Sequence, residues 1–266
     1  MRKLAETVLD EKPSGAPGGS SEAAPPLLIA HGLFGSARNW RAIARALARD
    51  RPVVTVDMRN HGASFHHPAH DYPAMAADLG ASIAAHGAAV DLLGHSMGGK
   101  AAMALALSKP ASVRRLVVAD IAPVAYTHSH AGHIAAMRAV DLGVVASRAE
   151  ADAQLAAAGV DEAPVRAFLL QSLLLQQTPP RWALNLDALD KSMADLVGWP
   201  GVPGWFDGPA LFLAGGQSDY LQPAHHAAIR AQFPAAQFAT IAGAGHWVHA
   251  EKPREVIAAV AEFLSA

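Results

Sequence analysis

Short segments rich in apolar residues recur along the chain, and such segments are typical of strands buried in a parallel sheet. Six of them lie at residues 27–30, 52–56, 89–93, 113–119, 209–214 and 236–241. Segments with apolar residues at helical spacing lie between or after them, at residues 39–49, 75–86, 98–108, 225–232 and 254–264. Residues 4–9 predict a short edge strand ahead of this series. The alternation predicts the α/β class, with a mostly parallel sheet flanked by helices.

The pattern changes at residue 124, and from there to about residue 207 only helical spacing is found. The helices predicted in this stretch lie at residues 147–158, 162–176 and 187–197. An insertion of this kind is typical of a lid on an α/β core. We therefore expect a core made of residues 1–123 and 208–266, with a helical lid made of residues 124–207.

A serine flanked by glycines follows the apolar run at residues 89–93, in the sequence Gly94-His95-Ser96-Met97-Gly98, and a predicted helix begins directly after it. Strand, sharp turn and helix in this order form a nucleophile elbow, which holds a serine hydroxyl above the edge of a sheet. The same stretch, continued to Lys100, also fits G-x-x-x-x-G-K, the phosphate-binding loop. Ala101, however, stands where that loop needs a Ser or Thr hydroxyl for magnesium. This stretch alone leaves both interpretations open.

A serine nucleophile needs a base, and position distinguishes His246 among the 14 histidines of the chain. His246 follows the last predicted strand in a glycine-rich loop, and the carboxyl ends of parallel strands meet at the edge that carries the elbow. His249 is a weaker candidate because it lies closer to the final helix. Two carboxylates, Asp120 and Asp219, each follow a core strand and fit the chain order Ser, Asp, His. The spacing leaves the choice between them open.

The tetrahedral intermediate of acyl transfer needs backbone N–H donors for its oxyanion. Met97, directly after the serine, offers one donor, and Leu33 is expected to offer the second, with Phe34 as the alternative. Glycines on both sides of that pair let the backbone approach a substrate oxygen closely. A phosphate loop needs neither this second turn nor a late histidine, so a hydrolase is favoured. Asp57 is interpreted as a carboxylate that braces its loop rather than as a catalytic group.

Composition narrows the class of protein further. The chain has 266 residues, 52% of them hydrophobic and 17% charged, which suits one large domain with a small insert. Its formal net charge of -2 gives no case for nucleic acid or an anionic membrane as the main partner. Cysteine is absent, the N-terminus lacks the apolar core of a signal peptide, and no apolar run has transmembrane length. We expect a cytoplasmic monomer or small homo-oligomer without a membrane span.

Two histidine-rich stretches invite a metal hypothesis. They contain His61, His66, His67 and His70 in one case and His128, His130 and His133 in the other. Their spacing matches no strong zinc pattern and no cysteine is present to help. We expect both stretches to be solvated loops, with no metal and no other cofactor. A loop is also expected at residues 12–26, which are rich in Pro, Gly, Ser and Ala.

Five blocks of sequence together resemble the bacterial YbfF-type esterases, which are lidded α/β-hydrolases with eukaryotic abhydrolase-domain relatives. The blocks are HGLFGS at residues 31–36, DMRNHG at 57–62, GHSMGGK at 94–100, DIAP at 120–123 and GAGHWVHAEKP at 243–253. The resemblance runs from about residue 26 to the C-terminus and becomes thinner through residues 129–195. Many hydrolases share the elbow, whereas the DMRNHG and DIAP blocks are far more specific.

The resemblance implies a nucleophile at Ser96, a base at His246 and an acid at Asp120, because this family takes its acid from the DIAP block. It also implies hydrolysis of carboxylic esters, with acyl thioesters cleaved by some members. We predict a cofactor-free serine esterase acting on a small-molecule ester with an apolar acyl group, its oxyanion hole formed by Leu33 and Met97. The alternatives are a carbon–carbon bond hydrolase or lyase on the same fold and, more remotely, a nucleotide-binding protein or a non-catalytic binding module.

Overall fold

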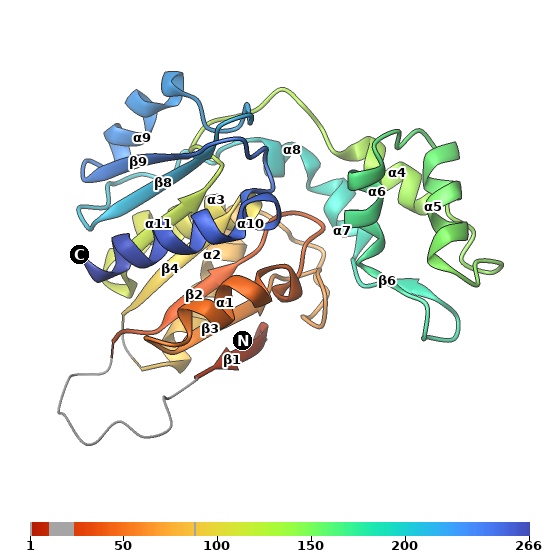
Figure 1. Ribbon diagram of the computed structural model, residues 1–266, viewed down its shortest axis with the longest axis horizontal. Coiled ribbons are helices and arrows are strands. Elements are labelled where there is room, and N and C mark those ends of the chain that lie inside the picture. Colours follow the sequence, from red (N-terminus) through yellow and green to blue (C-terminus); the bar gives the residue numbers. More distant parts are fainter. Residues whose placement is uncertain (1, 11–23, 88) are drawn as a thin grey trace.

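The computed structural model describes residues 2–10, 24–87 and 89–266, and a twisted sheet runs through its larger body (Figure 1). The sheet has seven strands in the order β1-β3-β2-β4-β5-β8-β9. Their bounds are β1 Ala5–Leu9, β2 Leu27–Ala30, β3 Val53–Asp57, β4 Val90–His95, β5 Val113–Ala119, β8 Ala210–Gly215 and β9 Ala236–Ile241. Strand β1 pairs antiparallel with β3, and every other neighbouring pair is parallel. The predicted α/β class and the edge strand are therefore confirmed, while residues 12–23 of the predicted loop lie outside the described residues.

Helices cover both faces of the sheet, as Figure 1 shows. On one face, α1 (Arg41–Leu47) and α11 (Pro253–Ser265) bury Ile43, Leu47 and Val260 against the apolar side of the strands. The other face carries α2 (Tyr72–Ala85), α3 (Met97–Ser108) and α9 (His226–Gln232). Shorter helices are η1 Ala37–Trp40, η2 Pro110–Ser112, η3 Pro223–His225 and α10 Val248–Glu251. Among the helices within the described ranges, none combines the length and the apolar character needed to cross a membrane.

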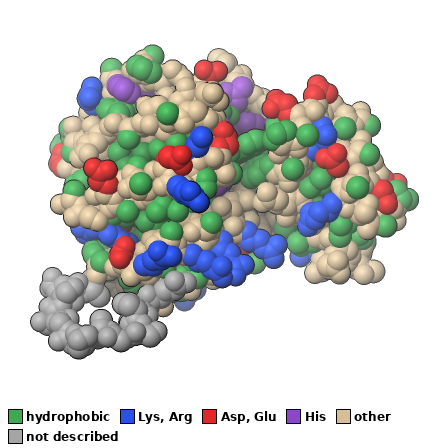
Figure 2. All heavy atoms as spheres, in the orientation of Figure 1, with side chains coloured by type: hydrophobic (Ala, Val, Ile, Leu, Met, Phe, Trp, Pro, Cys, Tyr) green, Lys and Arg blue, Asp and Glu red, His purple; other side chains and the backbone are tan. Residues whose placement is uncertain are grey.

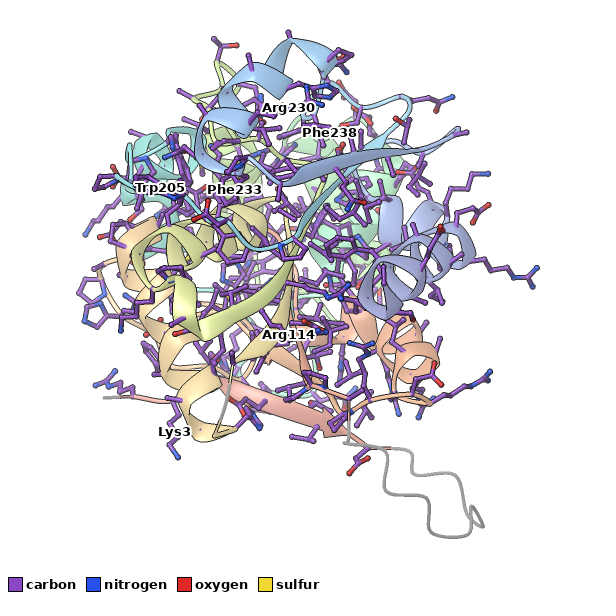
Figure 3. The ribbon with its side chains drawn as sticks, turned by 90° about the vertical axis from the view of Figure 1, so that its left-hand side faces the viewer. Lys3, Arg114, Trp205, Arg230, Phe233 and Phe238 are labelled. Atoms are coloured by element: carbon purple, nitrogen blue, oxygen red, sulfur yellow. The ribbon has the colours of Figure 1, made fainter. Side chains whose placement is uncertain are left out.

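An aromatic cluster closes the β9 end of the sheet. The ring centroid of Phe212 on β8 lies 5.6 Å from that of Phe233 and 5.9 Å from that of Phe238. The Arg230 guanidinium lies over the Phe238 ring, 5.0 Å from its centroid, and Figure 3 shows the two side chains together. This packing ties the last helix of that face to the edge strand.

The residues between β5 and β8 form a second body beside the carboxyl ends of the strands (Figure 1). It contains α4 Ala131–Ala139, α5 Arg148–Ala157, α6 Ala163–Leu170, α7 Leu186–Lys191 and α8 Met193–Val197. A short antiparallel pair, β6 Leu173–Leu174 and β7 Arg181–Trp182, follows α6. The helix predicted at residues 162–176 therefore ends early, because the backbone of Leu173 pairs with Trp182 across a turn that contains Pro179 and Pro180. Helix α4 was not predicted, since its His- and Gly-containing start hides the apolar periodicity.

Candidate active site

Ser96 occupies the turn between β4 and α3, with a backbone φ of 52° and ψ of -119°. Only glycine fits two residues before and two residues after it. A Cβ at Gly94 would lie 2.3 Å from the Gly98 carbonyl oxygen, and a Cβ at Gly98 would lie 2.5 Å from the Ala30 carbonyl oxygen. The Ser96 amide donates to the Ala119 carbonyl on β5 at 3.0 Å, which ties the turn to the neighbouring strand. The strained backbone is thus held by its surroundings, as is usual where strain serves a site.

A hydrogen-bonded line joins Ser96 to His246 and Asp120. His246 Nε2 lies 3.0 Å from Ser96 Oγ, and His246 Nδ1 lies 2.8 Å from Asp120 Oδ2. Asp120 follows β5 and its side chain has no solvent exposure. The amide of Gly215 donates to Asp120 Oδ1 at 2.9 Å, and the Ser218 hydroxyl donates to Oδ2. These donors fix the carboxylate in one orientation toward the imidazole.

Asp219 lies elsewhere, with its side chain exposed at the surface. The structure therefore brings Asp120, and not Asp219, to His246. The turn containing Asp219 nevertheless contributes to the site through its neighbour Ser218, which is 5% exposed and bonds to the Asp120 carboxylate. Sequence reasoning missed this serine because it considered only the acidic residue of the turn.

The His246 ring is also held from the side. It stacks on Tyr220, with ring centroids 3.8 Å apart and planes inclined by 19°. The Tyr126 hydroxyl donates to the Tyr220 carbonyl at 2.6 Å and accepts from the Ala122 amide at 2.9 Å. His95 Nε2 donates to the His246 carbonyl at 2.9 Å, and burial holds the pKa of His95 well below its usual value. No sequence pattern indicated these three supports.

The two residues expected to supply oxyanion donors, Leu33 and Met97, line one cavity together with Ser96. Met97 is the first residue of α3, so its N–H precedes the hydrogen-bonding ladder of the helix. Leu33 lies in a turn closed by the Gly35 amide, which donates to the Gly32 carbonyl at 3.0 Å. Within the described residues the Leu33 amide donates to no acceptor, whereas the Phe34 amide donates to His61 Nε2 at 3.2 Å. Of the two expected candidates in this turn, Leu33 is the one with a free donor.

Two buried histidines brace this turn. His31 Nδ1 donates to the Gly32 carbonyl at 2.8 Å and His31 Nε2 accepts from the Met58 amide at 3.0 Å. His61 Nδ1 donates to the Arg59 carbonyl at 2.9 Å. Burial lowers the pKa of His31 to about 4 and that of His61 to about 3, so both rings are neutral at pH 7. Each ring can therefore donate with one nitrogen and accept with the other.

The expectation that both histidine-rich stretches are solvated loops is wrong for part of them. His61 and His70 are 0% and 1% exposed. His61 accepts from the Phe34 amide, and the ring centroid of His70 lies 5.5 Å from that of His61. His130 and His133 are partly buried and line a cavity beside Ser96. Among the residues that the structure describes, no group of three His, Asp or Glu side chains is arranged to hold a metal ion.

Ser96 lines two cavities. The larger, about 90 Å³, is lined by Trp40, His246 and Trp247 from the core and by Val165 and Phe168 from α6. The smaller, about 30 Å³, runs past Leu33 and Met97 toward Lys100 and Tyr126. A reacting carbonyl at Ser96 could thus place its two substituents in separate spaces.

Lys100 does not face an open phosphate cradle. Its ammonium donates to the carbonyls of Val197, at 3.2 Å, and Gly198 at the carboxyl end of α8, and it lies 4.7 Å from the Tyr126 ring centroid. Burial lowers the pKa of Lys100 to about 7. These contacts of Lys100, together with Ala101 in place of a Ser or Thr, disfavour the nucleotide-binding interpretation.

Asp57 accepts from the amides of Ala37 and Ala63, both at 2.8 Å, and so braces its loop.

Comparisons with known proteins identify the family of this chain. Residues 25–253 match the family model described as the α/β-hydrolase fold. The chain is 45% identical over 250 residues to the mouse sn-1-specific diacylglycerol lipase ABHD11, covering 91% of this chain and 81% of that one. It is 41% identical over 244 residues to esterase YbfF of Escherichia coli, covering 90% and 93% of the two chains. A solved marine microorganism esterase superposes with a TM-score of 0.90 at 35% identity, over 99% of this chain and 100% of that one.

The chain therefore belongs to the α/β-hydrolase family. Within that family its similar relatives carry the names of esterases and lipases, and it is an enzyme of the carboxylic ester hydrolase class.

Proposed function

We propose that this enzyme cleaves esters by nucleophilic catalysis with Ser96, His246 and Asp120. The observation that carries the proposal is the continuous line of hydrogen bonds from the buried Asp120 carboxylate through His246 to the Ser96 hydroxyl. With Asp120 accepting from Nδ1–H, the Nε2 atom of a neutral His246 is left as the acceptor that faces Ser96. This is the arrangement that a general base for a serine nucleophile requires.

The reaction then proceeds in two halves. His246 takes the Ser96 proton as Oγ attacks the carbonyl carbon, and the imidazolium returns that proton to the departing alcohol. Water, deprotonated by the same ring, then attacks the acyl-enzyme and releases the acid and free Ser96. The amides of Leu33 and Met97 are the proposed oxyanion donors, and each is expected to lower the barrier by about 3 kcal/mol.

The cavities indicate how an ester would lie. The leaving oxygen must face His246 Nε2, so the alcohol part is assigned to the larger cavity, which His246 lines. The acyl part then points past Leu33 and Met97 into the smaller cavity. Both spaces are small; the larger is mostly apolar, whereas hydroxyl, imidazole and ammonium groups also line the smaller, and this favours a modest ester with an apolar alcohol part. We propose residues 124–207 as the lid, since α6 supplies one wall of the larger cavity, and acyl thioesters as a second substrate class.

A chain-length series of p-nitrophenyl esters and the matching CoA thioesters tests this function. The wild-type enzyme is expected to hydrolyse short acyl esters, and Ser96→Ala to lose that activity to the limit of detection. Ser108→Ala is the matched control, because it replaces an exposed serine outside the site in the same way. Activity that persists in Ser96→Ala overturns the proposal. Cleavage of a carbon–carbon bond without any ester hydrolysis supports the alternative reaction class instead.

A further inference from the structure

Four exposed arginines form a row along η1, α1 and the turn after α1, and the row begins next to the turn at residues 31–35. Arg38 lies in η1, Arg41 and Arg45 in α1, and Arg49 two residues beyond its end, and all four are exposed. Arg41 and Arg45 are four residues apart in α1 and so project within about 40° of one another, and Arg38 and Arg49 extend the row at its two ends. The buried Ile43 lies on the opposite side of the helix. We call this row the α1 arginine stripe.

Among the described residues the stripe has no charge partner. Within the described residues none of its guanidinium groups forms a salt bridge or a side-chain hydrogen bond, whereas other arginines pair with aspartates. Those paired arginines are Arg51, Arg59, Arg114, Arg138 and Arg166. Four like charges on one face repel one another, and Arg41 at the first position of α1 opposes the helix dipole. Helix stability therefore does not explain the stripe.

The stripe begins at the rim of the larger cavity. Arg38 and Arg41 flank Asn39 and Trp40, which line that cavity. The Asn39 side-chain amide donates to Gln171 on the lid side at 2.7 Å, so η1 meets residues 124–207 at this rim. Figure 2 shows Lys and Arg side chains gathered along the lower front of the larger body, over the place that α1 occupies in Figure 1. An ester entering the cavity from this side passes the arginines first.

We propose that the α1 arginine stripe docks the enzyme on an anionic lipid surface, with the mouth of the larger cavity turned toward the lipid. The proposal rests on the proposed function, in which the cavity takes an apolar ester. Guanidinium groups bind phosphate oxygens by paired hydrogen bonds, and each basic residue at an anionic bilayer strengthens binding by roughly fivefold. The net charge of -2 averages over the whole chain and conceals this local concentration.

Vesicle co-sedimentation tests the proposal in the Ser96→Ala background, where lipid is not consumed. Binding is expected to vesicles of phosphatidylcholine mixed with phosphatidylglycerol, not to phosphatidylcholine alone, and to weaken as salt rises. Adding Arg41→Gln and Arg45→Gln should weaken it roughly 25-fold. The matched control adds Lys109→Gln and Arg230→Gln, two exposed basic residues on other elements, and should bind as the parent does. Melting temperatures of all variants check that each is folded.

Equal binding to both kinds of vesicle, or equal binding by the stripe and control variants, overturns the proposal. The alternative ligand of the arginines is a soluble substrate whose leaving group carries phosphate, such as a CoA thioester. The Arg41→Gln/Arg45→Gln exchange in the enzyme with Ser96 intact tests this alternative. If Arg41→Gln/Arg45→Gln raises KM for a CoA thioester but not for an uncharged thioester, while vesicle binding is unchanged, the lipid surface is excluded. Because vesicle binding is measured without catalysis, a failure of the proposed function is detected separately, as ester hydrolysis that survives Ser96→Ala.

Discussion

Replacing Asp120 with asparagine tests the proposed acid at its hydrogen bonds. Asp120 Oδ1 accepts from the Gly215 amide, while Oδ2 accepts from Ser218 and from His246 Nδ1 at 2.8 Å. An asparagine has one acceptor oxygen, and if it keeps the Gly215 bond, its NH2 group faces His246. The imidazole must then carry its proton on Nε2, where it cannot accept the Ser96 proton. The same exchange in serine proteases lowers kcat about 10⁴-fold, equivalent to about 5.5 kcal/mol of barrier.

We expect a loss of this size in kcat for hydrolysis of a p-nitrophenyl ester, with KM little changed. Asp219→Asn is the control, because that carboxylate is exposed and does not contact His246. It should retain wild-type activity within about a factor of two, as surface exchanges commonly do. If Asp120→Asn stays within tenfold of the wild type, or Asp219→Asn falls as far as Asp120→Asn is expected to, the reasoning is refuted.

Three further predictions concern Ser218, Gly32 and two buried histidines. Ser218→Ala removes a donor to the Asp120 carboxylate and should lower kcat about tenfold, a barrier change of about 1.4 kcal/mol; an unchanged steady-state rate would remove Ser218 from the account. Gly32→Ala places a Cβ 2.9 Å from His95 Nδ1 and 3.1 Å from Ser96 Cβ, and should lower kcat/KM roughly a hundredfold by displacing the nucleophile and its neighbour; ester kinetics at wild-type level would contradict this. Burial lowers the pKa of His31 and of His249 to about 4, so as pH falls from 6.5 toward 4 the unfolded chain binds protons that the folded chain does not. The free energy of unfolding should then fall by up to about 1.4 kcal/mol per pH unit for each ring, whereas denaturant midpoints that stay constant over this window would be inconsistent with buried neutral histidines.

Much of the fold was predictable because a strand buried on both faces leaves a continuous apolar run. The run at residues 27–30 coincides with β2 for this reason, and the continuous apolar residues 116–119 form the buried part of β5. The β6–β7 pair was not predictable, since each strand has two residues and no period can be read from so few. Tertiary contacts, such as the Trp182 indole donating to the Met137 carbonyl at 3.0 Å, fix that pair instead.

The candidate site was predictable where chemistry and chain order coincide. Ser96 and His246 follow strands whose carboxyl ends share one edge, and the structure brings them together. Asp120 and Asp219 could not be separated by spacing, because β5 and β8 are neighbours and both residues lie beyond the same edge. The choice depends on a backbone turn at Asp120, where φ is 51°, and on the direction in which each side chain leaves its loop. Tyr220 carries no sequence signal at all, since its contribution is a stacking contact.

Covalent labelling of Ser96 tests the central claim most directly. A fluorophosphonate reacts only with a serine whose proton is removed by a neighbouring base, and intact-mass measurement followed by peptide mapping locates the adduct. The account predicts one adduct per wild-type chain, on Ser96, and none on Ser96→Ala, with slow labelling in Asp120→Asn. An adduct on another serine, or ester hydrolysis that continues after Ser96 is fully labelled, would contradict it.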